Sequence, residues 1–368
     1  MRKITAMFTA LVLFLCAAAG YAEDDLDELL IEETIEYVEP EATPSLYESD
    51  GSTLITVTCT GDFTIGGDNY HHKNIFEKEL EAQDGDINFT MRNVRDILMN
   101  DDMTLINFEG TFTETTYVPD KKKNNDYLFN APPSYVSMLT DNGIEAAALE
   151  NNHVMDHGQE GYDDTMQTLR DAGIIYSNSE EMGVFEVKDI QIAMLSYLCI
   201  DRYQTLWDKV PEDIKAAKEK YPIVIVSFHW GKELDYTPNE NQIKMGRLAV
   251  DSGADLVIGN HSHRINPIEE YKGVYICYSL GNFCFAGNTK PSDMNSYLFQ
   301  VRFKVKDGVA STKAFRIIPI KISSRKDRND FIPTVITEDV NIDGIINTLK
   351  ENGRKLEYAV SEYPLEWE

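Results

Sequence analysis

Histidines are concentrated at the ends of apolar segments that are predicted as strands. Of the seven histidines in the sequence, five follow such segments. A lone histidine in that place is more often a hydrogen-bonded structural residue, but chance placement would not collect five of them. Ligands gather outside the carboxyl ends of strands in open α/β folds, so the pattern predicts a binding site there. The five are His153, His157, His229, His261 and His263.

Carboxylate and amide side chains follow other predicted strands and complete a metal-binding composition. Asp62, Glu109 and Asn152 each come after an apolar run. Imidazole combined with carboxylate and amide oxygens suits zinc, manganese or iron. Two ions a few ångström apart need a bridging carboxylate, which either Asp62 or Glu109 could supply. Side chains alternate along an extended backbone, so His261 and His263 are expected on the same side, near one cluster, with one imidazole for each ion.

Strand-like and helix-like segments alternate over residues 53 to about 290. This alternation predicts a layered α/β fold. The helix at 239–252 has a predicted capping box, in which Glu240 stands three residues after Thr237 and Pro238 takes the first helical position. Two further helices are predicted at 89–99 and 158–172. The predicted strands are 54–58, 104–107, 144–149, 190–195, 223–228, 255–258 and 274–278.

The pattern changes after about residue 296. Residues 297–305 alternate apolar and polar side chains, Asp307-Gly308 is a turn signal, and 311–320 forms a second strand pattern. This arrangement predicts a β-hairpin, and antiparallel strands beside an α/β core indicate a mixed or two-sheet fold. A last helix is predicted at 342–358, where it would be packing material. We therefore interpret 53–335 as the main domain and 336–368 as a C-terminal helical extension.

The N-terminus has the features of an export signal. Two basic residues precede an apolar run that ends in small residues, so 1–22 is predicted to be a signal peptide that is removed after Ala22. An uncleaved membrane anchor is the alternative, and Cys16 raises a lipoprotein option, although Leu15 precedes it where a small residue is expected. Residues 23–52 are interpreted as an acidic disordered linker, because 23–50 contain twelve Asp or Glu and no Lys or Arg.

Charge and cysteine usage restrict the partners further. Of the net charge of −28, −18 falls on residues 51–368, which argues against nucleic acid as a partner, because its phosphates need a basic face. A small anionic substrate remains compatible, because bound cations reverse the charge of a pocket locally. Four cysteines follow the signal, without the spacing of a CxxC zinc site or of a dense disulfide framework. We predict buried thiols with at most one bridge at Cys59, Cys199, Cys277 and Cys284.

Six short motifs occur in a fixed order, each at the end of a predicted strand. Together they resemble the CapA-type poly-γ-glutamate capsule-biosynthesis proteins of the calcineurin-like metallophosphoesterase superfamily, and they span roughly residues 54–335. Each motif alone is short, so the signal comes from their order and placement. The motifs are Gly61-Asp62, Asn107-Phe108-Glu109, Asn151-Asn152-His153-x-x-Asp156-x-Gly158, His229-Trp230-Gly231-x-Glu233, Gly259-Asn260-His261-x-His263 and Tyr278-Ser279-Leu280-Gly281-Asn282-Phe283.

The resemblance implies a fold, a cofactor and roles for single residues. The fold would be a four-layered sandwich with two central mixed sheets flanked by helices, and the cofactor would be two divalent ions of manganese, zinc or iron. His153 would be the proton donor to the leaving oxygen rather than a ligand. By position, Asp62 and His263 would bind the first ion, Glu109 would bridge, and Asn152, His229 and His261 would bind the second.

The sequence departs from the superfamily at the first ion. Classical phosphoesterases have Asp-x-His, whereas this chain has Asp62-Phe63-Thr64, so that ion would be weakly held unless another group fills in. His71 and His72 could reach, although solvated loop histidines are the simpler interpretation. Asp156 and Glu233 could orient ligand histidines, or could serve turns and helix surfaces. Asn282 could contact substrate or only close a turn. Four aromatic residues could line a polymer groove or belong to the core: Tyr127, Phe129, Trp207 and Trp230.

Two functions follow from the resemblance. The first is an exported protein that makes, anchors or processes a cell-surface polymer, as a metal-dependent hydrolase of phosphoesters that uses metal-activated water. Its partners would be the polymer or a small phosphoester, with membrane-associated capsule machinery, at the cell surface or outside the cell. The alternative is a non-hydrolytic polymer-binding or assembly subunit on the same scaffold, which the missing imidazole and the acidic tether motivate.

Overall fold

The computed structural model describes residues 48–68, 75–117, 119, 127–200 and 203–367. These residues belong to one compact unit, Leu46–Glu368. The predicted signal peptide, most of the acidic linker, and His71 and His72 lie outside the described residues. Among the helices that are described, none combines the length and the apolar character that crossing a membrane requires.

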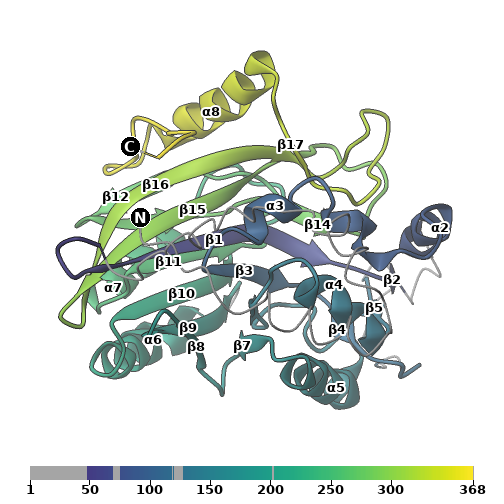
Figure 1. The fold of residues 1–368 in the computed structure, drawn as a ribbon, viewed down its shortest axis with the longest axis horizontal. Coiled ribbons are helices and arrows are strands. Elements are labelled where there is room, and N and C mark those ends of the chain that lie inside the picture. Colours follow the sequence, from purple (N-terminus) through teal and green to yellow (C-terminus); the bar gives the residue numbers. More distant parts are fainter. Residues whose placement is uncertain (1–47, 69–74, 118, 120–126, 201–202, 368) are drawn as a thin grey trace, which may run out of the picture. The chain divides into compact units, whose positions relative to one another are not determined.

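Two large mixed sheets form the centre of this unit (Figure 1). The first runs in the order β17 (Thr334–Val335), β16 (Val309–Lys321), β15 (Asn295–Lys306), β1 (Thr53–Thr64), β3 (Met103–Phe108), β6 (Ala146–Ala148) and β7 (Ile175–Ser177), and β14 (Asn282–Phe285) also pairs with β1. The second runs in the order β12 (Ile268–Tyr271), β13 (Val274–Cys277), β11 (Leu256–Asn260), β10 (Ile223–Trp230), β9 (Ile190–Cys199) and β8 (Gly183–Val187). A small third sheet joins β2 (Gly67–Asp68), β5 (Phe129–Ala131) and β4 (Thr111–Phe112).

The buried side chains arrange these sheets and the helices in four layers. One core lies between the sheets, where alternate residues such as Val57 and Leu105 meet Ile225 and Ile258. A second core lies between the first sheet and a helical layer of α2 (Ile75–Ala82), η2 (Ile87–Met91), α3 (Arg95–Leu98), η3 (Pro133–Val136), α4 (Ser137–Thr140) and α5 (Gly158–Asp171). A third lies between the second sheet and α6 (Tyr203–Lys218) and α7 (Glu240–Asp251). The predicted four-layered α/β sandwich is confirmed.

The predicted hairpin is confirmed, but two local predictions are wrong. Asp307 and Gly308 both have positive φ, as a two-residue type I′ turn requires. The helix predicted at 89–99 is instead divided into η2 and α3, because Val94 between them has φ −129° and ψ −8°, outside the helical region. The capping box of α7 is formed by Asn239 and Gln242 rather than by Thr237 and Glu240, because the Asn239 carboxamide accepts from the first free N–H groups of the helix.

The C-terminal segment packs on the same cores. Helix α8 (Asp339–Gly353) buries Ile345 and Leu349 in the core between the sheets, and Tyr363 joins them from the tail. The tail also bonds to both sheets, since Val360 N–H donates to the carbonyl of Ile268 and the Pro364 carbonyl accepts from Ile317 N–H. The four cysteines are buried free thiols, in agreement with the prediction: Cys59, Cys199, Cys277 and Cys284.

Candidate metal centre

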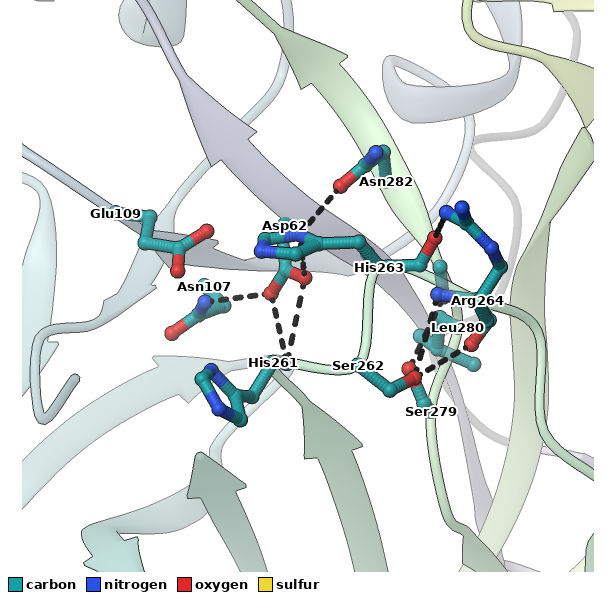
Figure 2. Close-up of polar contacts among 12 residues, drawn as sticks. Asp62, Asn107, Glu109, His261, Ser262, His263, Arg264, Ser279, Leu280 and Asn282 are labelled. Atoms are coloured by element: carbon teal, nitrogen blue, oxygen red, sulfur yellow. Dashed lines mark hydrogen bonds and ion pairs between the residues drawn. The ribbon is translucent and has the colours of Figure 1, made fainter. Parts of the chain in front are cut away.

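The candidate site lies where the carboxyl ends of strands from the two large sheets meet. Asp62 lies near the end of β1, and Glu109 directly follows its parallel neighbour β3. His229 lies near the end of β10, and His261 directly follows its parallel neighbour β11. All four side chains are at least 95% buried. The strand ends that the sequence singled out therefore converge on one interior space (Figure 2).

A bulge in β1 turns Asp62 into this space. Val57 and Cys59 face the second sheet, so strict alternation would give residue 61 that face and would turn Asp62 away. The register of β1 against β3 shifts between Cys59 and Asp62, and Phe63 rather than Asp62 enters the helix-side core. Bulges commonly re-aim a side chain next to a functional site. The bulge requires Gly61, because a Cβ there would stand 2.1 Å from the carbonyl oxygen of Gly281.

Replacing Gly61 with Ala should therefore destabilise the protein by more than about 3 kcal/mol, since backbone rather than a flexible side chain blocks the new methyl group. Gly344 in α8 is the matched control, because a Cβ there meets nothing within 4 Å. Gly344→Ala should be neutral or stabilising by about 0.5–1 kcal/mol. Urea unfolding of both variants measures the difference, and an unchanged midpoint for Gly61→Ala would refute the bulge.

Two groups of three potential ligands share one carboxylate. Asp62, Glu109 and His263 form the first group, and Glu109, His229 and His261 form the second, each with its ligand atoms within 4.8 Å of one another. Neither oxygen of Glu109 has a hydrogen-bond partner among the described residues, and the same is true of His261 Nδ1. A buried oxygen or nitrogen lone pair that accepts no hydrogen bond costs free energy, and a bound cation removes this cost. The donor atoms of each group could therefore hold a divalent ion, and Glu109 is available to both groups.

Burial and charge shift the pKa values of these groups strongly. Burial, followed by the charge of Asp62, raises the pKa of Glu109 to about 8. Burial disfavours the imidazolium of His263, but the Glu109 charge and the contact with Asp62 outweigh it and raise its pKa to about 10. The Nδ1 atom of His263 lies 3.0 Å from Asp62 Oδ2. Burial and neighbouring imidazoles lower the pKa of His261 to about 4 and that of His229 in the same direction, so both rings are neutral at pH 7.

Metal binding should consequently release protons. The charge of Glu109 is itself a cause of the raised pKa of His263, so the two groups share protons at pH 7 that a cation must displace. We expect a net release of protons when the chain is loaded with Mn²⁺ at pH 7, and a smaller release at pH 9, where the pair holds fewer protons. Calorimetric titration in buffers of different ionisation enthalpy counts them. His263→Asn should lower the number of protons released, and loading without proton release at pH 7 would contradict the assignment.

Asn107 links the two ligand groups and was not predicted as a site residue, although the sequence pattern includes it. Its Nδ2 donates to Asp62 Oδ1 over 2.8 Å and lies 3.3 Å from His229 Nδ1. Leu105 faces the second sheet, and Asn107, two residues later in the same strand, faces the same way. This alternation could have identified Asn107 from the sequence. Asn152, which follows β6, is exposed, but its Oδ1 lies 2.6 Å from His229 Nε2. Its carboxamide therefore reaches the second group from the surface.

His153 is partly exposed and lies close enough to Glu109 and His229 for its charge to affect their pKa values. Its Nδ1 lies 2.8 Å from Asp156 Oδ2, and the imidazole is 13% exposed whereas the carboxylate is buried. The same carboxylate oxygen accepts from the backbone N–H of Phe129 over 2.8 Å, which fixes it in place. Asn151 holds the loop, since its Nδ2 donates to the Phe108 carbonyl and its Oδ1 accepts from His153 N–H. Asp156 thus orients a histidine that remains accessible.

His261 and His263 belong to different ligand groups, but not because they alternate along an extended backbone, as predicted. Their backbone is not extended, because φ is +96° at His261 and +53° at His263. The chain turns after β11, and the His261 N–H lies 3.3 Å from both oxygens of Asp62. Asn282 Oδ1 lies 2.8 Å from His263 Nδ1, so this residue contacts a ligand histidine. Glu233 is exposed, and it influences the pKa values of Glu109 and His261 through its charge.

Comparison with known proteins gives consistent results. The family described as "Bacterial capsule synthesis protein PGA_cap" matches residues 56–287. "PGA biosynthesis protein CapA" of Bacillus subtilis (strain 168) is 31% identical over 291 residues, which cover 73% of this chain and 72% of that protein. "Capsule biosynthesis protein CapA" of Bacillus anthracis is 26% identical over 296 residues, which cover 73% of this chain and 67% of that protein.

Among solved structures, one described as a novel phosphatase from Mycoplasma pneumoniae is similar with a TM-score of 0.44 and 13% identity, over 79% of this chain and 97% of that chain. A similarity at this level carries no argument about the fold or the function. The family match extends over well more than half of the chain and includes every residue of both ligand groups. This chain therefore belongs to the bacterial capsule synthesis family PGA_cap, the CapA-type proteins.

Proposed function

We propose that this protein is an exported metal-dependent hydrolase of phosphoesters, which acts in the synthesis, anchoring or processing of a cell-surface polymer. The observation that carries the proposal is the pair of ligand groups that share the buried Glu109, whose oxygens accept no hydrogen bond from the described residues and lie no closer than 3.4 Å to His229 Nε2. Paired ions at such a carboxylate are the arrangement of many phosphoester hydrolases. One CapA relative is named a PGA biosynthesis protein and another a capsule biosynthesis protein, and the CapA-type resemblance implies poly-γ-glutamate as the polymer.

The chain would hold the two ions with six side chains. When bound, the ions would lower the pKa of water and neutralise charge that develops on the phosphoryl oxygens. Asn107 would keep Asp62 and His229 in place through its carboxamide. The ligands would be Asp62, Glu109 and His263 for the first ion, and Glu109, Asn152, His229 and His261 for the second.

His153 would protonate the leaving oxygen. Its imidazole is partly exposed and its Nδ1 is held by Asp156, and Nε2 would carry the transferred proton. Asn282 would hold the ring of His263 or contact the substrate, and the exposed Glu233 would add negative charge at the rim.

Localisation and domain limits form part of the same proposal. Residues 1–22 would direct export, 23–52 would act as a linker, 53–335 would carry the hydrolase, and 336–368 would support it. The protein would work at the cell surface or outside the cell, with membrane-associated capsule machinery and the polymer or a small phosphoester as partners. Its net charge of −28 argues against nucleic acid.

Activity of the purified full chain tests the proposal. With Mn²⁺ or Zn²⁺ it should hydrolyse a generic phosphomonoester or phosphodiester, lose this activity with a chelator, and regain it when metal returns. Asp62→Ala and His229→Ala should each lower both the activity and the amount of bound metal. Full metal loading without turnover of any ester would refute hydrolysis.

A polymer-binding or assembly subunit is the second candidate, and one observation favours it. His263 and Asp62 already form an ion pair at 3.0 Å, so the first group satisfies itself with a proton and supplies only one imidazole. A subunit of this kind would bind poly-γ-glutamate equally well with and without metal, and His153→Ala would not alter that binding. Metal-dependent turnover that His153→Ala abolishes would exclude it.

A further inference from the structure

We propose that three aromatic residues beside His153 form a leaving-group subsite, which selects phosphoesters whose leaving alcohol carries a planar ring or amide face. The three residues, Tyr127, Phe129 and Phe285, are called the aromatic wall below. This inference rests on the proposed hydrolase function, because it takes His153 as the proton donor to the leaving oxygen. It adds a substrate class that the ligand groups themselves do not define.

The aromatic wall contacts two histidines of the candidate centre, His153 and His263. The ring of Phe129 packs on His153 with centroids 4.7 Å apart, and the ring of Phe285 packs on His263 at 4.9 Å. Phe129 and Phe285 meet edge to face at 6.1 Å and 72°. The proton donor and a ligand of the first ion are therefore joined by one continuous aromatic surface.

Tyr127 extends this surface outward from His153. Its ring is stacked on Phe129 at 5.6 Å with planes 13° apart, and the residue is 40% exposed. Phe129 is only 4% exposed, whereas Phe285 is half-buried, so Tyr127 presents the outer part of the wall to a ligand. A leaving group that departs from His153 toward solvent would pass along this ring. Trp230, by contrast, is fully buried on the other side of the second sheet.

The aromatic wall is built in advance of binding. The backbone N–H of Phe129 donates to the buried carboxylate of Asp156, which also holds His153. Gly287 lies in close contact with both phenylalanine rings, since a Cβ there would be 2.8 Å from the Phe285 ring and 3.0 Å from the Phe129 ring. A rigid wall selects by shape, because little ordering cost remains when the ligand binds.

The chemistry of the aromatic wall defines the substrate class. Its three side chains carry no ionised group, so recognition comes from stacking and apolar contact rather than from ion pairs. A planar ring or amide face would gain from this contact, whereas a small aliphatic alcohol would not. The wall thus favours a phosphoester with a flat leaving group over one with a short alkyl group.

A comparison of two esters tests the inference. With Mn²⁺-loaded full chain, kcat/KM and the calorimetric affinity are measured for 2-naphthyl phosphate and for methyl phosphate. Tyr127→Ala should lower kcat/KM and affinity for the naphthyl ester about fivefold and leave the methyl ester unchanged, while Tyr127→Phe keeps both. Tyr358→Ala is the control, because Tyr358 is equally exposed, at 39%, but packs on Tyr271 away from the aromatic wall.

The outcomes separate the two proposals. Unchanged naphthyl kinetics in Tyr127→Ala, or an equal loss for both esters, would overturn the inference while hydrolysis stands. If wild type hydrolyses neither ester, the hydrolase proposal fails, but the affinities still test the aromatic wall. Tighter binding of the naphthyl ester than of the methyl ester, which Tyr127→Ala removes, supports the wall as a binding surface. Absence of such a preference in wild type overturns it.

Discussion

Replacing Glu109 with Gln should remove both ions and reduce hydrolysis by at least about 1000-fold, because in the proposed centre this carboxylate would hold both ions, which would supply several kcal/mol of the rate enhancement. Glu109 belongs to both ligand groups, so no other single substitution should affect the two ions equally. Mass spectrometry of metal content should show two ions per chain in wild type and fewer than about 0.5 in the variant. Glu114→Gln, which changes an exposed glutamate, should keep both ions.

The same substitution should stabilise the metal-free protein. The pKa of Glu109 is raised on folding, so the folded state resists its ionisation, and this cost grows as pH rises above the unfolded pKa of about 4.5 until it levels off near 8. At pH 7.5, Glu109→Gln should therefore raise the melting temperature of chelator-treated protein by a few degrees, with little effect at pH 4. A lower melting temperature at pH 7.5 would show that Glu109 has a structural role.

His153→Ala should lower kcat by about 100- to 10,000-fold while both ions stay bound, because a positioned general acid contributes an effect of that size. The loss should be small for an ester of p-nitrophenol and large for an alkyl ester, since only the poor leaving group needs protonation. Asp156→Asn should give a smaller loss, because that side chain orients the imidazole without delivering the proton. Loss of metal in His153→Ala would instead make His153 a ligand, and unchanged alkyl-ester kinetics would deny it a catalytic role.

Much of the fold could be predicted because its strands obey simple alternation and their ends carry polar residues. In β10, Ile223 and Ile225 face the first sheet and His229 has the same parity, so its direction follows from the sequence. The β15–β16 hairpin was predicted from Asp307-Gly308, which adopts the expected positive φ angles. These features depend on local preferences that neighbouring residues determine.

The parts that could not be predicted depend on contacts between distant segments. The bulge that turns Asp62 inward exists because Gly61 lies against the backbone of Gly281, more than two hundred residues later. The double contact of Asn107 needs both sheets in place before Asp62 and His229 are its neighbours. The aromatic wall likewise joins β5 to β14, and no spacing in the sequence indicates that Phe129 meets Phe285.

The sharing of Glu109 is the central claim, and anomalous diffraction from Mn²⁺-soaked crystals of the full chain tests it most directly. Two anomalous peaks are predicted, each in contact with the Glu109 carboxylate, one beside Asp62 and His263 and the other beside His229 and His261. One peak without contact to Glu109, or no peak between the two sheets after soaking at saturating Mn²⁺, would contradict the account.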